Sequence, residues 1–392
     1  MKLYSKFVLV FTAFMLMTGV LSPDAFAQEG GVKLADDAGS AILIERDTGE
    51  IMFEKNSNEQ LPPASMTKIM TMLLIMEAVD NGSITMDEKV RTSERAASMG
   101  GSQIFLEPGE EMTVEEMLKG IAIASGNDAS VAMAEHLAGS EDEFVNMMNE
   151  KAKELGLKDT NFVNSNGLPA AEHYTTAHDM AMMSRELLKY EKITEYTSLY
   201  EDYLREDSDR KFWLVNTNRL VKFYPGVDGL KTGFTREAKY CLTATANKND
   251  MRVIAVVMGA STPKDRNRQI TEMLDYAFSQ YKLHRQYDRG TVIDQVKVSK
   301  GSRSRVDAVT GENVSMLTRK GESLEGATEE VTWQENLKAP LKNGDPVGKL
   351  TIKLEGKTLS EVPLVITEDV PEASVWQLIK RTTSVLVGKE RS

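Results

Sequence analysis

The chain has 392 residues, and its 59 acidic residues outnumber its 47 lysines and arginines, so the formal net charge is -12. Such an acidic chain is a poor partner for the phosphate backbone of nucleic acids, which we exclude as ligands. The length is more than one hydrophobic core usually serves, and it predicts two domains.

The first 27 residues predict a secretory signal peptide. Lys2 and Lys6 precede an apolar run over residues 7–21, and Ala25-Phe26-Ala27 forms a small-residue cleavage site. The run is too short for a membrane-spanning helix. Cleavage would remove two lysines and one aspartate, which leaves 45 basic and 58 acidic residues and a net charge of -13.

Residues 35–283 predict one α+β domain. Strands at 41–45 and 51–55 flank a turn at Asp47-Thr48-Gly49, and strands return at 241–246 and 253–258 before a helix that begins near Pro263. Helical patterns fill the middle of the domain, at 65–80, around Met117, at 141–155 and at 176–189. Strands at both ends with helices between them indicate an antiparallel sheet covered by helices.

Ser65-Met66-Thr67-Lys68 stands at the start of the first predicted helix. Residues three apart share a helix face, so the Lys68 amine can reach the Ser65 hydroxyl. Serine is a poor nucleophile until a base takes its proton. Lysine can be that base only if its pKa falls from about 10.4 to about 7, which costs about 4 to 5 kcal/mol and requires burial or a second cation. By itself the tetrapeptide also fits an ordinary helix start with serine as N-cap.

Ser125-Gly126-Asn127 lies 60 residues after Ser65, between two apolar helical patterns. The first of these opens at Thr113-Val114-Glu115-Glu116, which predicts a capping box. Gly126 is expected to leave Ser125 and Asn127 on a tight turn, with both side chains pointing into a cleft. The alternative is a helix corner in which Asn127 or Asp128 is the N-cap.

Lys231-Thr232-Gly233 follows 166 residues after Ser65, at the head of a strand predicted over residues 240–246. Gly233 has no side chain, so a ligand backbone could come close to that edge. The alternative is a loop glycine beside a surface lysine.

In this order the three motifs resemble SxxK, SxN and KTG of the penicillin-binding proteins and serine β-lactamases. The resemblance covers about residues 35–390. With further similarity at 40–54, 99–102, 107–110 and 227–230, the chain looks like the low-molecular-mass D-alanyl-D-alanine carboxypeptidases, above all the sporulation-associated ones of Bacillus-type bacteria. The implied fold is a penicillin-binding/β-lactamase-like domain.

The resemblance implies an enzyme that removes the terminal D-alanine from peptidoglycan pentapeptides without metal or cofactor. Ser65 would be the nucleophile, Lys68 the general base and Ser125 a proton relay to the leaving amine. Asn127 would hold Lys68 and the substrate amide. Peptidoglycan stem peptides would be the substrates, and β-lactam antibiotics would be covalent inhibitors.

The implied binding residues come from the KTG strand and the helix after the last strand. Lys231 and Thr232 would bind the terminal carboxylate, and the charge of Lys231 would also lower the pKa of Lys68. Gly233 lies between them and Phe234, whose backbone N–H would form the oxyanion hole with that of Ser65. Relatives carry histidine where Phe234 stands. Arg266 is expected near the substrate carboxylate, with an ordinary surface arginine as the alternative.

Residues 284–370 predict a small all-β domain because apolar residues alternate with polar ones, as at Val296 and Val298. Residues 371–392 predict an amphipathic helix whose apolar face is flanked by Lys380, Arg381, Lys389 and Arg391. This composition favours a helix lying on an anionic membrane surface, and a helix docked on the β-domain is the alternative. With the signal peptide, it predicts an exported protein on the outer face of the cytoplasmic membrane, facing the cell wall.

Two other functions compete with this interpretation. A β-lactamase shares all three motifs, but residues 159–173 lack the ExxLN-type glutamate with which class A enzymes activate water. A non-catalytic wall-binding protein would not need all of the motif residues. The four histidines lack metal-ligand spacing, and the single cysteine, Cys241, is expected to be a buried thiol.

Overall fold

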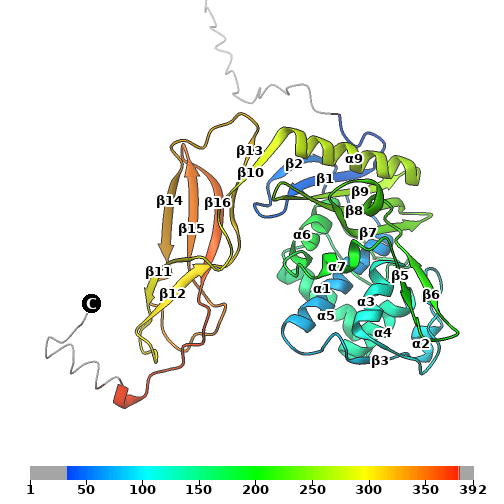
Figure 1. Cartoon of the computed structure of the whole chain (residues 1–392), viewed down its shortest axis with the longest axis horizontal. Coiled ribbons are helices and arrows are strands. Elements are labelled where there is room, and N and C mark those ends of the chain that lie inside the picture. The colour runs from blue at the N-terminus through cyan, green and yellow to red at the C-terminus, as the bar shows by residue number, and fades with distance from the viewer. Residues whose placement is uncertain (1–32, 378, 380–392) are drawn as a thin grey trace, which may run out of the picture. The chain divides into compact units, whose positions relative to one another are not determined.

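The computed structural model describes residues 33–377 and 379. Its main sheet is antiparallel and has the strand order β2-β1-β9-β8-β7 (Figure 1). The strands are β1 (Ser40–Glu45), β2 (Ile51–Lys55), β7 (Val227–Thr235), β8 (Lys239–Lys248) and β9 (Met251–Ala260). The N-terminal strand β1 therefore pairs with β9, the last of these strands in the sequence. This agrees with the strand patterns predicted at both ends of the domain.

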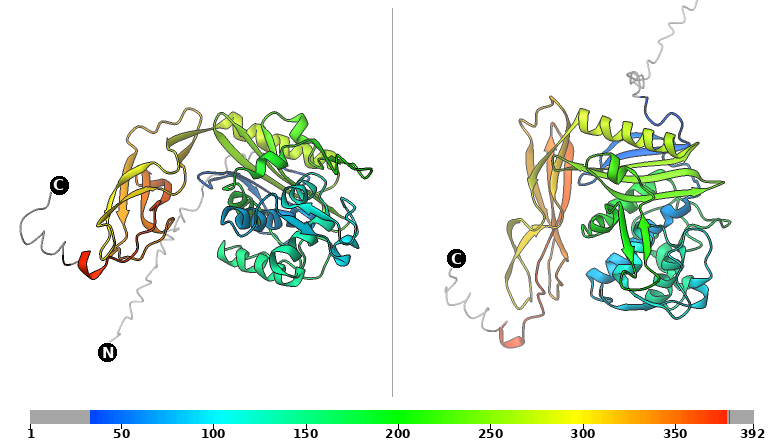
Figure 2. Two further views of the ribbon diagram at one scale, coloured as in Figure 1. Left: turned by 60° about the horizontal axis from the view of Figure 1, so that its bottom comes forward. Right: turned by 45° about the vertical axis from the view of Figure 1, so that its right-hand side comes forward.

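The sheet is buried on both faces. Ile42 and Ile44 pack into the helical core, whereas Ala41 and Leu43 pack against α9 (Pro263–Gln280) on the opposite face. Figure 2 shows the ribbon of α9 on one side of the sheet and the other helices of the domain mainly on the other side. This division follows from the two-residue period of a strand, which points successive side chains to opposite faces. The Thr262 side chain caps α9, and Pro263 occupies its first turn, where its missing N–H costs nothing.

The helices between β2 and β7 form the second core. A 3₁₀ turn at Ala64–Thr67 leads into α1 (Lys68–Asp80), whose first nine residues are all buried, because helices surround it. The predicted helix over 65–80 is therefore a 3₁₀ turn followed by an α-helix. The same core contains α2 (Glu94–Ala97), α3 (Val114–Ala122), α4 (Asn127–Ala138), α5 (Glu141–Glu154), α6 (Ala177–Leu187) and α7 (Ile193–Thr197). The short helix α8 (Leu220–Phe223) instead packs with α9 on the other face of the sheet.

Local signals in this region correspond to observed contacts. The capping box predicted at Thr113 and Glu116 is present in both directions at the start of α3. Two short antiparallel strand pairs lie between the helices: β3 (Lys89–Arg91) with β4 (Glu111–Thr113), and β5 (Glu201–Leu204) with β6 (Phe212–Val215). The predicted antiparallel sheet covered by helices is thus confirmed.

The C-terminal part of the described chain is all β, as predicted. Its sheet has the order β11-β12-β16-β15-β14, and a separate pair joins β10 to β13. Leu350 and Ile352 belong to its own buried core, and Glu355 and Gly356 both have positive φ in the turn between β15 and β16. The strands are β10 (Tyr281–Tyr287), β11 (Val292–Lys297), β12 (Arg305–Thr310), β13 (Val314–Arg319), β14 (Thr328–Trp333), β15 (Pro346–Leu354) and β16 (Lys357–Val365).

Polar contacts link the β1–β2 turn to the β-domain. The Asp47 side chain is only 5% exposed and lies 2.6 Å from Arg46 and 3.2 Å from Arg285. Asn313 and Ser315 also donate hydrogen bonds to the Asp47 carboxylate, each at 3.3 Å. The sequence identified this segment only as a hairpin turn.

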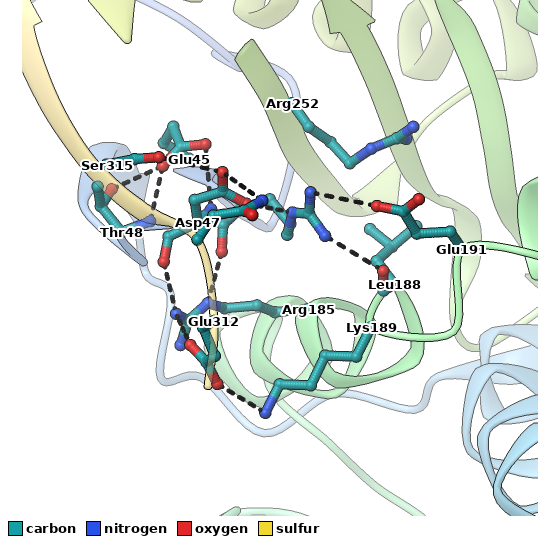
Figure 3. Close-up of polar contacts among 12 residues, drawn as sticks. Glu45, Asp47, Thr48, Arg185, Leu188, Lys189, Glu191, Arg252, Glu312 and Ser315 are labelled. Carbon is teal, nitrogen blue, oxygen red and sulfur yellow. Dashed lines mark hydrogen bonds and ion pairs between the residues drawn. The ribbon is translucent and has the colours of Figure 1, made fainter. Parts of the chain in front are cut away.

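A second ion-pair group lies beside the first (Figure 3). Glu312, between β12 and β13, is 3.0 Å from Lys189 and 3.7 Å from Arg185. Arg185 also donates to the backbone carbonyl oxygens of Arg46 and Asp47. Charged groups therefore fasten the β-domain to the turn and to the end of α6, and Leu283 and Leu317 of the β10–β13 pair add apolar packing against the α9 side of the sheet.

The two terminal predictions lie largely outside the described residues. The signal peptide over 1–27 is wholly outside them, and of the helix predicted over 371–392 only 371–377 and 379 are described. Within the described residues, no helix is long and apolar enough to span a bilayer.

Candidate active site

Ser65 and Lys68 lie on consecutive turns of one helical segment, and the Lys68 Nζ is 3.1 Å from the Ser65 Oγ. Lys68 is completely buried. Its Nζ also donates to the Asn127 Oδ1 and to the backbone carbonyl of Asn166, both at 2.7 Å. A neutral amine has two N–H groups, and these two acceptors can use both, which leaves the lone pair for the Ser65 hydroxyl.

The pKa of Lys68 is lowered well below its usual value, mainly by burial and secondly by the charge of Lys231, whereas Asp128 opposes the shift. Burial and a second cation were the two causes expected from the sequence, and desolvation is the larger of them. Both effects disfavour the ammonium form. The tertiary structure therefore supplies the shift that a lysine base requires.

Ser125 and Asn127 come together with this pair. Ser125 has φ +64 and is 4% exposed on the turn between α3 and α4. Asn127 is the first residue of α4, and Gly126 is the N-cap, so the expected turn holds Ser125 and the helix holds Asn127. The Asn127 Nδ2 donates to the Gly100 carbonyl oxygen at 2.6 Å, which orients its Oδ1 toward Lys68.

Lys231, Thr232 and Gly233 lie inside edge strand β7, not at the head of the strand over 240–246 as predicted. The pattern was misread because two glycines and a lysine interrupt the apolar signal of β7. Lys231 and Thr232 are both buried. A Cβ at Gly233 would lie 2.7 Å from the Pro63 carbonyl oxygen. Glycine is therefore required because the segment that carries Ser65 packs closely against β7 at this position.

Lys231 has a pKa lowered to about 7, first by burial and then by the charge of Arg266. Arg266 is 6% exposed in the first turn of α9 and lines the same cleft, so it is not an ordinary surface residue. Phe234 is exposed and stacks on Tyr240, with ring centroids 4.4 Å apart. The aromatic side chain therefore forms a wall of the cleft opening.

These residues meet at an open cleft of about 730 Å³. The cleft is lined by Ser65, Ser102, Ser125, Thr217, Arg219, Thr232, Gly233, Phe234, Tyr240, Pro263, Lys264, Arg266 and Asn267. Within the described part of the chain, every charged residue of this lining is a cation. The cleft thus combines an activated hydroxyl with an environment that favours a carboxylate-bearing ligand.

Sequence reasoning missed several supporting groups. The Asn166 carbonyl could not be found, because a backbone acceptor leaves no residue-type signal. Asp128 follows the SxN motif directly, and its carboxylate accepts hydrogen bonds from the Ile104 and Leu106 N–H groups. The Thr232 hydroxyl lies 2.7 Å from that of Thr217.

No group of three or more potential His, Cys, Asp or Glu metal ligands occurs within residues 33–377 and 379. Cys241 is fully buried, and burial raises its pKa to about 11. A protonated buried thiol is neither a nucleophile nor a metal ligand at neutral pH, so the prediction for Cys241 is confirmed.

Comparison with known proteins agrees with this geometry. The D-alanyl-D-alanine carboxypeptidase family (peptidase S11) matches residues 27–262, and the C-terminal domain of penicillin-binding protein 5 matches residues 281–372. The D-alanyl-D-alanine carboxypeptidase DacF of Bacillus subtilis (strain 168) is 61% identical over 371 residues, which cover 94% of this chain and 95% of the relative. DacC of Escherichia coli (strain K12) is 33% identical and covers 92% of each chain.

Solved structures show the same architecture. Penicillin-binding protein 5 from Haemophilus influenzae has a TM-score of 0.68 at 29% identity, covering 87% of this chain and 99% of that one. Penicillin-binding protein D2 from Listeria monocytogenes in its ampicillin-bound form has a TM-score of 0.56 at 30% identity, covering 63% and 99%. By sequence, by architecture and by the arrangement of its three motifs, this chain belongs to the D-alanyl-D-alanine carboxypeptidase family.

Proposed function

We propose that this serine-type D-alanyl-D-alanine carboxypeptidase forms its acyl-enzyme on Ser65, with Lys68 as general base. The observation that carries the proposal is the 3.1 Å contact between the two side chains, made by a fully buried lysine whose other two contacts are hydrogen-bond acceptors. A lysine held neutral in this way takes the serine proton as the hydroxyl attacks.

In the acylation step, Ser65 Oγ bonds to the carbonyl carbon of the penultimate D-alanine, and the proton passes to Lys68. The C–N bond to the terminal D-alanine then breaks, and the leaving amine takes a proton through Ser125. Water hydrolyses the ester and restores the free hydroxyl. The backbone N–H groups of Ser65 and Phe234 would stabilise the oxyanion, and such donors are typically worth about 3 to 4 kcal/mol each.

Binding of the substrate follows the charge of the cleft. Lys231 and Thr232 would bind the terminal carboxylate of a stem pentapeptide: Thr232 and Arg266 line the cleft, and Lys231 is the buried neighbour of Thr232 in β7. The Asn127 Oδ1 accepts a hydrogen bond from Lys68, and its Nδ2 donates to the Gly100 carbonyl oxygen. Asn127 would therefore contact the substrate amide through the same Oδ1 atom that holds Lys68. β-Lactams would acylate the same Ser65, in keeping with the ampicillin-bound form of the Listeria relative.

A β-lactamase would hydrolyse that acyl-enzyme quickly, which requires a base near the ester. The segment facing Lys68 offers the backbone carbonyl of Asn166 and not a carboxylate. We therefore expect slow deacylation of benzylpenicillin, and rapid turnover would favour the β-lactamase.

Covalent labelling with a fluorescent penicillin tests the site. The wild-type protein should label, and Ser65→Ala should not. A wild-type protein that stays unlabelled, or a Ser65→Ala variant that labels, contradicts the assignment. Release of D-alanine from a pentapeptide then separates carboxypeptidase from transpeptidase and β-lactamase activity.

For location, we infer export through the N-terminal signal peptide and attachment to the outer face of the cytoplasmic membrane. Ser374 and Gln377 exchange hydrogen bonds between side chain and backbone, as in a helix-starting capping box. Val375, Trp376 and Ile379 beyond it are exposed apolar residues at helical spacing. This supports an interfacial helix that starts at 375 and not at 371 as predicted, because Glu372 forms a β-bridge with Gly301 and the Ala373 N–H donates to the Lys300 carbonyl oxygen. A variant lacking 371–392 should lose membrane sedimentation, and retained sedimentation contradicts the anchor.

We also propose a role in sporulation, which is what the motif resemblance to the sporulation-associated carboxypeptidases implies. A transcriptional reporter followed through growth and spore formation would test it, and purely vegetative expression would contradict it.

A further inference from the structure

His173 makes a chain of hydrogen bonds that ends at the nucleophile. Its Nδ1 accepts from the Val163 N–H at 2.9 Å, and its Nε2 lies 2.8 Å from the Thr67 Oγ1. The Thr67 hydroxyl in turn donates to the Ala64 carbonyl oxygen at 2.8 Å. His173 and Thr67 are both buried.

In this series of hydrogen bonds, the neighbouring groups determine which atom donates and which accepts. The Nδ1 faces an N–H group and must be the acceptor, so a neutral imidazole carries its proton on Nε2. The Thr67 hydroxyl donates its one hydrogen bond to the Ala64 carbonyl oxygen, so its oxygen accepts a hydrogen bond from the His173 Nε2–H. The Phe162 ring packs edge-on against the imidazole with centroids 5.9 Å apart and holds its orientation.

The last acceptor, the Ala64 carbonyl, shares a peptide plane with the Ser65 N–H. Because a peptide unit is planar, a bond that fixes the direction of the carbonyl also fixes the direction of the N–H. Ala64 has φ +49, a conformation that an alanine adopts only under constraint from its surroundings. The Ser65 N–H is one of the two oxyanion donors in the proposed function, on which the present step rests.

We propose that His173 is a positioning residue that aims the Ser65 N–H at the oxyanion through Thr67 and the Ala64 carbonyl. It touches neither substrate nor the reacting atoms. Its loss would weaken a contact made in the transition state and leave substrate binding intact. The expected signature is a lower acylation rate and kcat with little change in KM.

Side-chain replacements separate the two hydrogen bonds of the imidazole. Asparagine at 173 can place an acceptor where Nδ1 stands and so keeps the Val163 bond but not the Thr67 bond. Glutamine can place a donor where Nε2 stands and so keeps the Thr67 bond. Thr67→Val removes the hydroxyl at nearly constant shape, Thr67→Ser keeps it, and His178→Asn, on the exposed end of α6, is the control.

The experiment measures the rate of labelling by a fluorescent penicillin and the kcat and KM for a pentapeptide, using the full chain. His173→Asn and Thr67→Val should each slow acylation by about 10- to 100-fold, with KM within about twofold. The double variant should be no slower than the slower single one, because both changes remove the same bond. His173→Gln should be faster than His173→Asn, and Thr67→Ser and His178→Asn should match the wild type.

A wild-type labelling rate in folded Thr67→Val overturns the proposal, as does a double variant whose loss is the product of the two single losses. A rise in KM without a fall in kcat also overturns it. Failure of the nucleophile assignment is distinguishable, because it appears as labelling of Ser65→Ala.

Discussion

The Lys68 Nζ donates to the backbone carbonyl of Asn166 at 2.7 Å, although the two residues are 98 positions apart. The carbonyl belongs to the segment that carries Gly167, which packs on Ala64. The backbone at Asn166 and Gly167 therefore contacts both Lys68, the proposed base, and the turn that carries Ser65, the proposed nucleophile.

Lys68→Arg should reduce acylation by about 10²- to 10⁴-fold. Arginine stays protonated at any working pH and cannot take the serine proton. The rate of penicillin labelling measures the effect. Lys89→Arg makes the same change on an exposed strand and should leave the rate unaltered. A Lys68→Arg variant that labels at the normal rate would exclude lysine as the base.

Gly167→Ala should abolish labelling. Gly167 has φ +87, and an added Cβ would stand 1.9 Å from the Ala64 carbonyl oxygen, so the nucleophile-bearing turn would have to move. Gly156→Ala is the matched control, since Gly156 has φ +71 with open space around it. The control should lose about 1 to 2 kcal/mol of stability from backbone strain and remain active. Equal activities of the two variants would contradict the role of the contact.

The KM for a pentapeptide should rise as the pH passes about 7. Lys231 has a pKa of about 7, so its charge is present below that pH and is lost above it. Each further pH unit should raise KM about tenfold, until other groups titrate. A pentapeptide with a C-terminal amide lacks the carboxylate and should show no such rise. A parallel rise for both peptides would assign the titration to another group.

The free energy of unfolding should fall as the pH drops from about 6.5 to about 4. Burial lowers the pKa of His173 to about 4, so the unfolded chain binds this proton in that window and the folded protein does not. The contribution is about 3 kcal/mol at full extent. Urea unfolding at a series of pH values measures it. His173→Asn should flatten the slope in this window, and an unchanged slope would show that other groups cause it.

Asp47→Asn should loosen the β-domain. The Asp47 carboxylate is nearly buried between Arg46 and Arg285, and removing its charge leaves the two guanidinium groups only their longer and more exposed contacts with Glu191 and Asp288, at a cost of about 1 to 3 kcal/mol. Limited proteolysis near the junction and the melting temperature report the effect. Asp288→Asn removes the exposed partner of Arg285 and should change neither. Equal behaviour of the two variants would show that the Asp47 contacts add no stability.

The sequence by itself determined the chemistry of the protein and the order of its parts. The proposed nucleophile, its lysine and the residues proposed to bind the carboxylate stand in short motifs whose residue types are dictated by the reaction. The hairpin of β1 and β2 and the capping box at Thr113, which marks the start of α3, could both be predicted because these signals depend only on neighbouring residues.

The tertiary structure decided what makes these motifs reactive. Burial of Lys68, the carbonyl of Asn166, and the chain from His173 to Ala64 all depend on segments about 100 residues away in the sequence. A backbone carbonyl has no residue-type signature, and the desolvation of a side chain depends on where the fold places it. The same reason explains why β7 was missed, since an edge strand built around Lys231 and Gly233 acquires its pattern only beside β8 and the turn at Ala64.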